Sequence, residues 1–298
     1  MTSFFVGSSG ASGVLDPDSP GPGGQPGQSG LRPFWRGGGT SLRVGVATVW
    51  LSVIVLLPVA AIAWQAAGGG WHAFWHAVTS HAAVDSFRVT LTISVGVTVV
   101  NTVFGLLIAW ILVRDDFIGR RLVDTVIDLP FALPTIVASL VMLVLYGNNS
   151  PVGLHLQHTA WGVAVALAFV TLPFVVRAVQ PVLLEIERET EEAAASLGAS
   201  GPKIFTSVIL PSLLPALLSG AGLAFSRAIG EFGSVVLIGG AVPGKTGVSS
   251  QWIRTLIEND DRTGAAVISI VLLAISFVLL FILRIVAARA ARREERAS

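Results

Sequence analysis

The chain has 298 residues, of which 53% are hydrophobic and only 12% are charged, whereas soluble domains carry about 25% charged residues. Its 19 basic residues nearly balance its 18 acidic ones, so no excess of positive charge indicates a nucleic-acid partner. The absence of cysteine excludes disulfides, thiol catalysis and cysteine metal ligands. This composition is typical of a membrane protein.

Residues 1–40 are dominated by glycine, proline and serine, with GPGGQPGQSG at their centre. Such a segment buries too little apolar surface to fold, so we expect a disordered tail. The first apolar run follows and ends in Ala61-Ile62-Ala63, which imitates a signal-peptidase site. Its apolar core of about twenty residues is longer than that of a signal peptide, so we expect an uncleaved first span.

Six stretches are long and apolar enough to cross about 30 Å of hydrocarbon. They cover residues 44–64, 89–113, 129–146, 159–176, 208–237 and 265–283. The fifth stretch is longer than one span requires. We therefore predict an all-α membrane protein with six transmembrane helices.

The basic residues predict the orientation of these spans. With the N-terminus inside the cell, fourteen of the 19 basic residues fall in cytoplasmic segments. The outer segments then hold only Arg88, Lys245, Arg254 and Arg262, and Arg227 lies in a span. Because lysine and arginine concentrate in cytoplasmic loops, we expect both termini, and the loop between the fourth and fifth spans, to be cytoplasmic.

The third span begins with the sequence DLPFALPT, residues 128–135. Pro130 and Pro134 prevent a regular first turn and free backbone groups to line a path. Pro130, Pro134 and Thr135 are therefore candidates for a translocation path. The alternative is a helix entry that simply starts with proline.

The loop at residues 188–211 is a polar island between two apolar spans. Thr190 is the expected N-cap of a short helix, and acidic residues follow it, where the helix dipole stabilises carboxylates. Alanines continue the helix, and Gly198 ends it in a left-handed conformation. The result is a stub roughly 12 Å long, which we expect to be a docking element. The alternative is an ordinary surface helix between spans.

The fifth span reads FSRAIGEFGSVVLIGG, with Arg227 and Glu231 one turn apart on one face. Intramembrane charges are costly and commonly mark a substrate route or a gate. Glycines at 220, 222, 230 and 233 permit close helix packing and a break in the helix, which explains the excess length. Two roles for the pair stay open: gating or contacting an anion, and fastening helices together.

Two further motifs favour no separate chemistry. Residues 239–246 match the phosphate-loop pattern, but that pattern binds nucleotide only between a strand and a helix, and here an apolar span precedes it. His72 and His76 are spaced for a shared metal on one helix face. The aromatic residues between them favour a segment at the lipid interface, so we expect no metal site.

Several of these segments resemble a known family. Glu192-Ala193-Ala194, Gly198 and Val208-Ile209-Leu210-Pro211 resemble the EAA loop of ABC importer permeases, although Val208 stands where the family usually has isoleucine. DLPFALPT, LPFVVRAVQPVL at residues 172–183 and RAIGEFGSV resemble sulfate/thiosulfate permeases, the first of the two permease partners in particular. The resemblance covers about residues 43–284. Molybdate permeases share the EAA loop and the GEFG-like span, and the run LPFVVRAVQPVL favours sulfate.

The resemblance implies the fold of a type I ABC importer permease over residues 43–288. It implies a homologous second permease, two copies of a cytoplasmic ATPase, an extracytoplasmic sulfate-binding protein and a place in the bacterial plasma membrane. ATP and magnesium would be bound by the ATPase, and this chain would carry no cofactor and no catalytic site. The residues expected to couple the chain to the ATPase are Glu191, Glu192, Ala193, Ala194, Gly198, Leu210 and Pro211.

Other classes of function fit the residues less well. A molybdate or other oxyanion importer is the main alternative. A secondary transporter would also have an intramembrane Arg–Glu pair, but it gives no reason for the EAA spacing. An intramembrane hydrolase needs a catalytic site within the spans, and no histidine or aspartate lies deep in any of them. The residues do not decide the preferred anion, whether Arg227 contacts it, whether the pore is a hetero- or homodimer, or what the tail does.

Overall fold

The computed structural model describes residues 38–294, and within that range every regular element is helical. The predicted disordered tail lies outside the described residues, except that Gly38–Thr40 already belong to α1 (Gly38–Leu51). The described side chains of α1, from Leu42 onward, are all exposed although most are apolar. A helix that is apolar on all sides is suited to a lipid environment. One π-helical turn (Ser52–Leu56) follows it.

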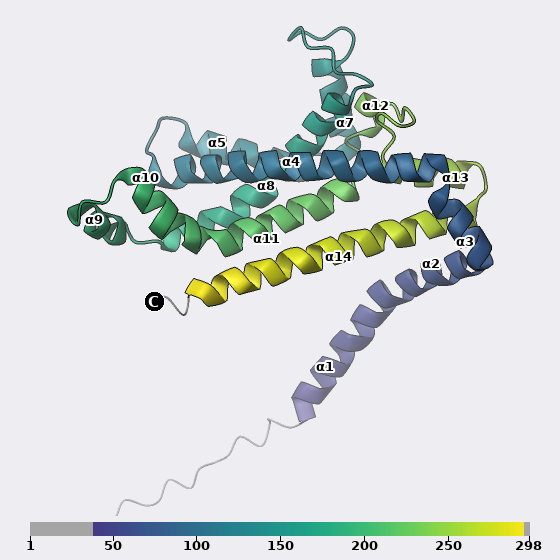
Figure 1. The fold of residues 1–298 in the computed structure, drawn as a ribbon, viewed down its shortest axis with the longest axis horizontal. Coiled ribbons are helices and arrows are strands. Elements are labelled where there is room, and N and C mark those ends of the chain that lie inside the picture. The colour runs from purple at the N-terminus through teal and green to yellow at the C-terminus, as the bar shows by residue number, and fades with distance from the viewer. Residues whose placement is uncertain (1–37, 295–298) are drawn as a thin grey trace, which may run out of the picture. The chain divides into compact units, whose positions relative to one another are not determined.

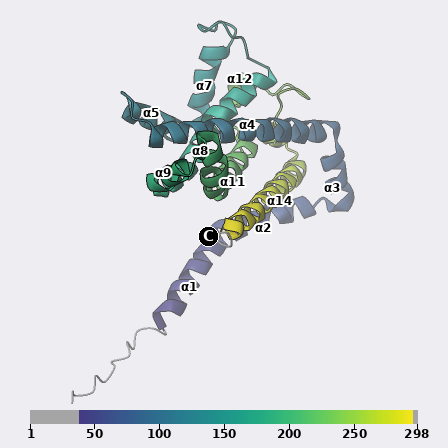
Figure 2. The ribbon, with the colours of Figure 1, turned by 60° about the vertical axis from the view of Figure 1, so that its left-hand side comes forward.

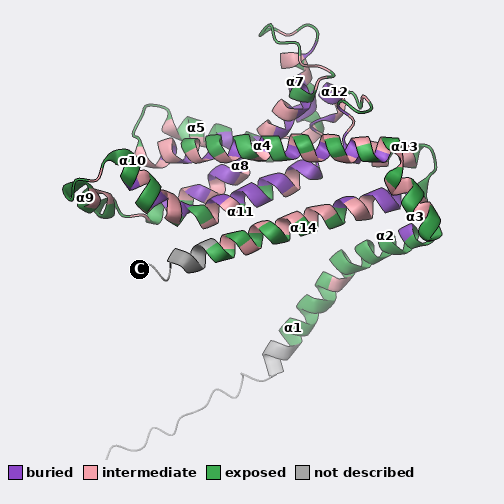
Figure 3. Cartoon of the chain, in the orientation of Figure 1, coloured by how far each residue is buried: buried purple, intermediate pink, exposed green. Residues whose placement is uncertain are grey.

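The chain divides into two compact units after Ile54. The larger unit, residues 55–298, is built on long helices that lie side by side (Figures 1 and 2). They are α4 (His81–Arg114), α8 (Ala160–Glu185), α11 (Leu210–Ile229) and α14 (Arg262–Glu294), with the shorter α2 (Leu57–Ala67) packed against α14. The core lies around α8 and α11, where buried residues concentrate (Figure 3). Gly220 permits this packing, because a Cβ there would lie 3.0 Å from the Val175 Cα.

The chain reverses at two ends of this unit (Figure 1). At one end, called here the α9 end, α8 is joined to α11 through α9 (Arg188–Ser196), α10 (Gly201–Ile204) and a π-helical turn (Phe205–Ile209). The opposite end, called the α13 end, carries α3 (Gly70–Thr79) and α13 (Ser249–Glu258). The loop between the fourth and fifth predicted spans therefore lies at the α9 end, and α3 and α13, which belong to segments predicted to lie outside, are at the opposite end (Figure 1).

The third predicted span is not a single straight helix. It consists of α6 (Leu129–Ala132) and α7 (Thr135–Tyr146), and α5 (Arg120–Ile127) precedes it. The chain bends by 114° between the helices of residues 120–132 and α7. The break falls at Leu133, which is extended and precedes Pro134, so the prolines interrupt the helix as expected. In both views α7 runs across the direction of α4 (Figures 1 and 2).

By length and apolar composition, five helices among residues 38–294 can cross a membrane, and the bent pair raises the number to six if it counts as one span. The prediction of six spans is therefore met in part. The predicted break in the fifth span is confirmed, because α11 ends at Ile229 and the short α12 (Val236–Gly239) follows after an irregular segment.

Candidate functional site

The α9 helix forms most of the predicted docking loop. It begins at Arg188 with an extended Glu187 before it, so the prediction of Thr190 as N-cap is wrong, and Thr190 lies in the first turn. The predicted end is confirmed: Gly198 has a φ of +86°, and its N–H donates to the Ala195 carbonyl at 2.9 Å. Glycine adopts this left-handed conformation without the penalty that a Cβ brings.

An ion pair holds α9 against the last turn of α4. The Arg114 Nη2 lies 2.5 Å from the Glu191 Oε1, and it also donates to the Ile186 carbonyl at 3.1 Å. The Arg188 guanidinium donates in return to the Arg114 carbonyl at 3.1 Å. Ala194 packs against the core cluster from the same side. The entry and the first turn of α9 are therefore fastened to the helix bundle.

The opposite face of α9 is free of such contacts. Glu192 and Ala193 are exposed, Gly198 is exposed, and Leu197 is 89% exposed. The predicted coupling residues thus fall into two groups, because Glu191 and Ala194 face the bundle. Leu210 and Pro211 lie in the first turn of α11, where Leu210 packs against the same core cluster.

The break in the fifth span is organised around a buried carboxylate. The side chain of Glu231 is 1% exposed, and its Oε2 lies 2.6 Å from the Arg227 Nη2. Its Oε1 accepts a hydrogen bond from the Ser234 N–H at 2.8 Å, and its carbonyl accepts one from the Ser250 hydroxyl at 2.8 Å. The pair is as predicted, but Glu231 lies beyond the end of α11 and not on one helix face with Arg227. Glu231 therefore fixes the irregular segment, while the Arg227 side chain stays 36% exposed.

The proline-bent segment, α5 to α7 (residues 120–146), reaches the same break, the irregular residues 230–235 between α11 and α12. Pro130 is buried in α6, and Pro134 directly precedes α7. Thr135 lies against Gly233, where a Cβ would stand 2.8 Å from the Thr135 Cβ. One turn further along α7, the Ser139 hydroxyl accepts hydrogen bonds from the Leu237 N–H at 3.0 Å and the Ile238 N–H at 3.4 Å. Thr135 and the Arg227–Glu231 pair, predicted from separate motifs, therefore adjoin the same irregular segment.

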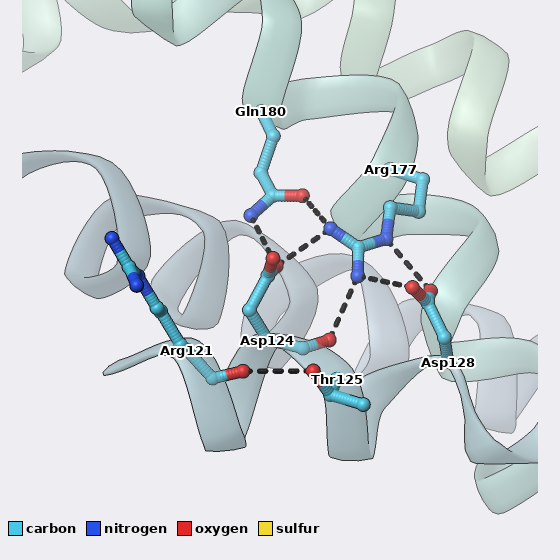
Figure 4. Close-up of polar contacts among 6 residues, drawn as sticks. All are labelled: Arg121, Asp124, Thr125, Asp128, Arg177 and Gln180. Carbon is cyan, nitrogen blue, oxygen red and sulfur yellow. Dashed lines mark hydrogen bonds and ion pairs between the residues drawn. The ribbon is translucent and has the colours of Figure 1, made fainter. Parts of the chain in front are cut away.

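The structure also shows a polar cluster that the sequence analysis missed (Figure 4). The Arg177 Nε and Nη2 bind the two carboxylate oxygens of Asp128 at 2.8 and 2.6 Å. Its Nη1 binds the Asp124 carboxylate at 2.7 Å and the Gln180 side-chain oxygen at 2.6 Å, and its Nη2 also binds the Asp124 carbonyl at 2.8 Å. Asp124, Asp128, Arg177 and Gln180 are called the Arg177 cluster below. The signal for it was an arginine in an apolar run, which requires acidic partners.

The Arg177 cluster borders a cavity of about 930 Å³. The C-terminal part of α4, the segment that leads into α5, and α8 form its walls. Arg120 also lines the cavity, and it forms a more exposed pair with Asp116 at 3.0 Å.

In the loop that matches the phosphate-loop pattern, the backbone N–H groups of the last turn are already hydrogen-bonded within the loop and cannot bind a phosphate. The N–H groups of Lys245, Thr246 and Gly247 all donate to the Val242 carbonyl, at 2.9 to 3.2 Å. The Thr246 hydroxyl is buried and donates to the Gly239 carbonyl at 2.6 Å. Helix α12, not a strand, precedes the loop. The geometry therefore favours an ordinary turn.

The histidine pair lies on α3, as its spacing predicted. The rings of Trp71, Phe74 and Trp75 stack or meet edge to face, with centroids 5.6 to 6.1 Å apart. Within the described part of the chain, no group of three or more histidine, cysteine or acidic side chains is placed to hold a metal ion. The aromatic surface of α3 agrees with the interfacial interpretation.

A family model described as "binding-protein-dependent transport system inner membrane component" matches residues 101–292. The chain belongs to this family. The matched residues contain α9, the Arg177 cluster, the bent segment and the fifth-span break. Like the family, the chain is a multi-pass membrane protein.

Curated members of this transport family confirm the resemblance to sulfate permeases. The chain is 42% identical over 262 residues to the sulfate transport system permease protein CysT of Escherichia coli. This match covers 86% of this chain and 95% of the relative. It is 44% identical over 239 residues to the probable sulfate transport system permease protein cysT of Chlorokybus atmophyticus, which covers 78% of this chain and 84% of the relative.

Solved structures confirm the fold of an ABC importer permease. A bacterial ABC transporter that imports the acidic polysaccharide alginate matches with a TM-score of 0.68 and 15% identity, over 84% of this chain and 95% of that one. The same kind of transporter, in complex with an alginate-bound periplasmic protein, matches with a TM-score of 0.69 and 16% identity, over 85% and 94%. At this identity the likeness concerns the fold alone.

Proposed function

We propose that this chain is the permease subunit of an ATP-driven ABC importer that carries sulfate or thiosulfate into the cell. One observation carries the proposal: 42% identity to a sulfate transport permease along 95% of that relative's length. The helical unit with a broken fifth span and a short docking helix supports it, because both features suit a pore that moves without chemistry of its own.

The proposed contact with the ATPase is the exposed face of α9, made of Glu192, Ala193, Leu197 and Gly198. Its other face is tied to α4 through Arg114 and Glu191, so a displacement of α9 moves the helix bundle with it. The α9 end gathers basic residues from the loops after α4 and α8, which supports a cytoplasmic position. Two copies of a cytoplasmic ATPase would dock on this chain and on a homologous second permease. ATP and magnesium would bind to the ATPase, and this chain would need no cofactor.

The proposed path for the anion passes the fifth-span break and the bent segment. Arg227 is the cation that remains partly exposed there. Pro134 lies at the interruption between α6, which contains Pro130, and α7, which begins with Thr135. Irregular backbone at membrane depth is tolerated where it lines a cavity or is buried in protein. An extracytoplasmic sulfate-binding protein would deliver the anion at the α13 end.

Uptake of labelled sulfate tests the proposal, in cells that lack this chain but keep its partners. Uptake that returns with the wild-type chain, and that excess thiosulfate but not molybdate suppresses, is the expected result. Molybdate uptake that depends on the chain while sulfate uptake does not would leave the architecture intact and replace the substrate. Sulfate uptake that persists after the ATPase is removed would indicate a secondary transporter instead.

A further inference from the structure

Arg177 has no hydrogen-bonding capacity left for a transported anion. A guanidinium carries five N–H bonds, and the five contacts in the Arg177 cluster occupy all of them with atoms of this chain. Gln180 closes the cluster by donating to the Asp124 carboxylate at 3.2 Å. Arg121 adds only its carbonyl, which accepts from Thr125 (Figure 4). The cluster therefore holds two segments together and is not an anion site.

The two segments that it holds are far apart in the sequence. Arg177 and Gln180 belong to α8, which continues directly into the entry of α9. Asp124 belongs to α5, and Asp128 lies between α5 and α6. Each of the two carboxylates contacts the guanidinium. Phe131 of α6 adds an edge-to-face contact with Phe174 of α8 at 5.1 Å between ring centroids. The cluster thus fastens the start of the bent segment to the helix that leads to α9.

The first turns of α7, after the bend, are fastened to the fifth-span break. Thr135 packs on Gly233, and the Ser139 hydroxyl accepts from the Leu237 and Ile238 N–H groups. A continuous path therefore runs from α9 along the backbone of α8 to Arg177, across the ion pair to Asp128, along the backbone to Thr135, and across the contact with Gly233. Chains of packed side chains and hydrogen bonds of this kind can carry coupling between distant sites.

We infer that Arg177 is a positioning residue for transport: acting through Asp124 and Asp128, it makes the bent segment move with α8, so that the position of α9 sets the position of the fifth-span break. This inference rests on the proposed function. Arg177 itself does not contact the anion. Its loss is therefore expected to change the rate of transport and its coupling to ATP hydrolysis, while the affinity for the anion stays the same.

The test uses the assembled transporter, with its binding protein and ATPase, in proteoliposomes. Arg177→Gln is expected to lower the maximal sulfate uptake per assembled complex about tenfold, with KM unchanged, because it removes charge-assisted hydrogen bonds. Arg177→Lys keeps the charge but not the paired contacts, so its maximal uptake is expected to lie between those of the wild type and Arg177→Gln. ATP hydrolysis stimulated by the binding protein continues, so more ATP is used per sulfate. The matched control is Arg120→Gln, which breaks the exposed pair with Asp116 beside the same cavity and is expected to transport normally.

A purely structural role gives a different result. It would reduce the amount of complex in the membrane and leave the uptake per complex unchanged, and that outcome in Arg177→Gln would overturn the inference. If Arg177→Gln does not assemble, the uptake per complex and the amount of complex are compared in Asp128→Asn and Arg177→Lys instead. A wild-type complex without sulfate uptake would instead overturn the proposed function.

A second measurement uses the absence of native cysteine. A single Leu129→Cys in the otherwise wild-type chain, 45% exposed in α6, gives a label site inside the bent segment. Its rate of reaction with a maleimide is expected to differ between the nucleotide-free and the ATP-bound transporter. Equal rates in the two states would show that the segment does not move with α8, and would also overturn the inference.

Discussion

Thr135 and Gly233 lie so close together that no side chain fits between them. A Cβ on Gly233 would stand 2.8 Å from the Thr135 Cβ and 3.1 Å from the Ile136 nitrogen. The first of these residues comes from the proline-bent segment and the second from the fifth-span break. The two segments predicted to line the translocation path are therefore in direct contact, and their relative position is sterically defined.

Replacement of Gly233 by alanine is expected to destabilise the protein by about 1–3 kcal/mol, because the added methyl group overpacks a contact made partly by backbone. The thermal midpoint of the purified complex measures the effect. Gly96→Ala is the control: Gly96 lies within α4 with no atom in the way of a Cβ, and alanine favours the helix. Equal midpoints for the two variants would mean that the segments can separate freely.

Glu191 and Glu192 are adjacent and are expected to respond differently to neutralisation. Glu191→Gln removes the charge that pairs with Arg114 and is expected to cost about 1–3 kcal/mol, because the Arg114 guanidinium is mostly buried and loses its ionic partner. Glu192→Gln changes an exposed side chain and is expected to leave stability within about 0.5 kcal/mol. Its effect is expected in the ATPase activity that the permease supports. Thermal unfolding together with ATPase assays separates the two residues.

The Arg114 variant serves as the check on this assignment. Arg114→Gln is expected to destabilise the protein more than Glu191→Gln does, because it removes the hydrogen bond to the Ile186 carbonyl as well as the pair with Glu191. The double variant is expected to add little to Arg114→Gln, because that change has already broken the pair. Additive effects would mean that Glu191 acts through some other contact.

A side chain at position 198 is expected to destabilise the end of α9. The φ of +86° at Gly198 costs an L-residue about 1–2 kcal/mol, although no atom blocks a Cβ there. Gly198→Ala is therefore expected to disturb the end of α9 and to lower sulfate uptake. Gly201→Ala is the matched control, since Gly201 also has open space but begins α10 with an ordinary φ. The comparison fails if both alanine variants support uptake equally.

Features with local causes could be predicted from the sequence. The end of the docking helix follows from Gly198, and the break in the third span follows from Pro134. Each of these signals acts within a few residues of the structure that it determines. The family-level fold was predictable for the same reason, because the motifs that indicate it are contiguous.

Features with distant partners could not be predicted in this way. Arg177 finds Asp128 across 49 positions and Asp124 across 53, and no local pattern identifies those partners. The 114° bend has a local cause in the prolines, but contacts of Thr135 and Ser139 with the fifth-span break hold the direction that α7 takes. Thr190 was a plausible N-cap, yet Arg114 holds the Ile186 carbonyl, and the helix begins directly after this anchor.

Arg227 and Glu231 are expected to respond unequally to substitution. Arg227→Gln leaves the carboxylate of Glu231 buried without its cation, which is expected to cost about 2–4 kcal/mol. Glu231→Gln removes the charge but keeps an acceptor for the Ser234 N–H, so its cost is expected to be smaller. The double variant is then more stable than Arg227→Gln alone, a reversal that the thermal midpoints of the three complexes reveal.

Arg254→Gln is the control for these midpoints, because its pair with Glu258 is also spaced by four residues but more than half exposed, and such pairs contribute at most about 1 kcal/mol. A double variant no more stable than Arg227→Gln would contradict the buried-charge explanation. Sulfate uptake by the double variant then separates the two roles left open for Arg227. A stable complex that has lost uptake indicates contact with the anion, whereas a stable complex that still transports indicates that the pair only fastens the break.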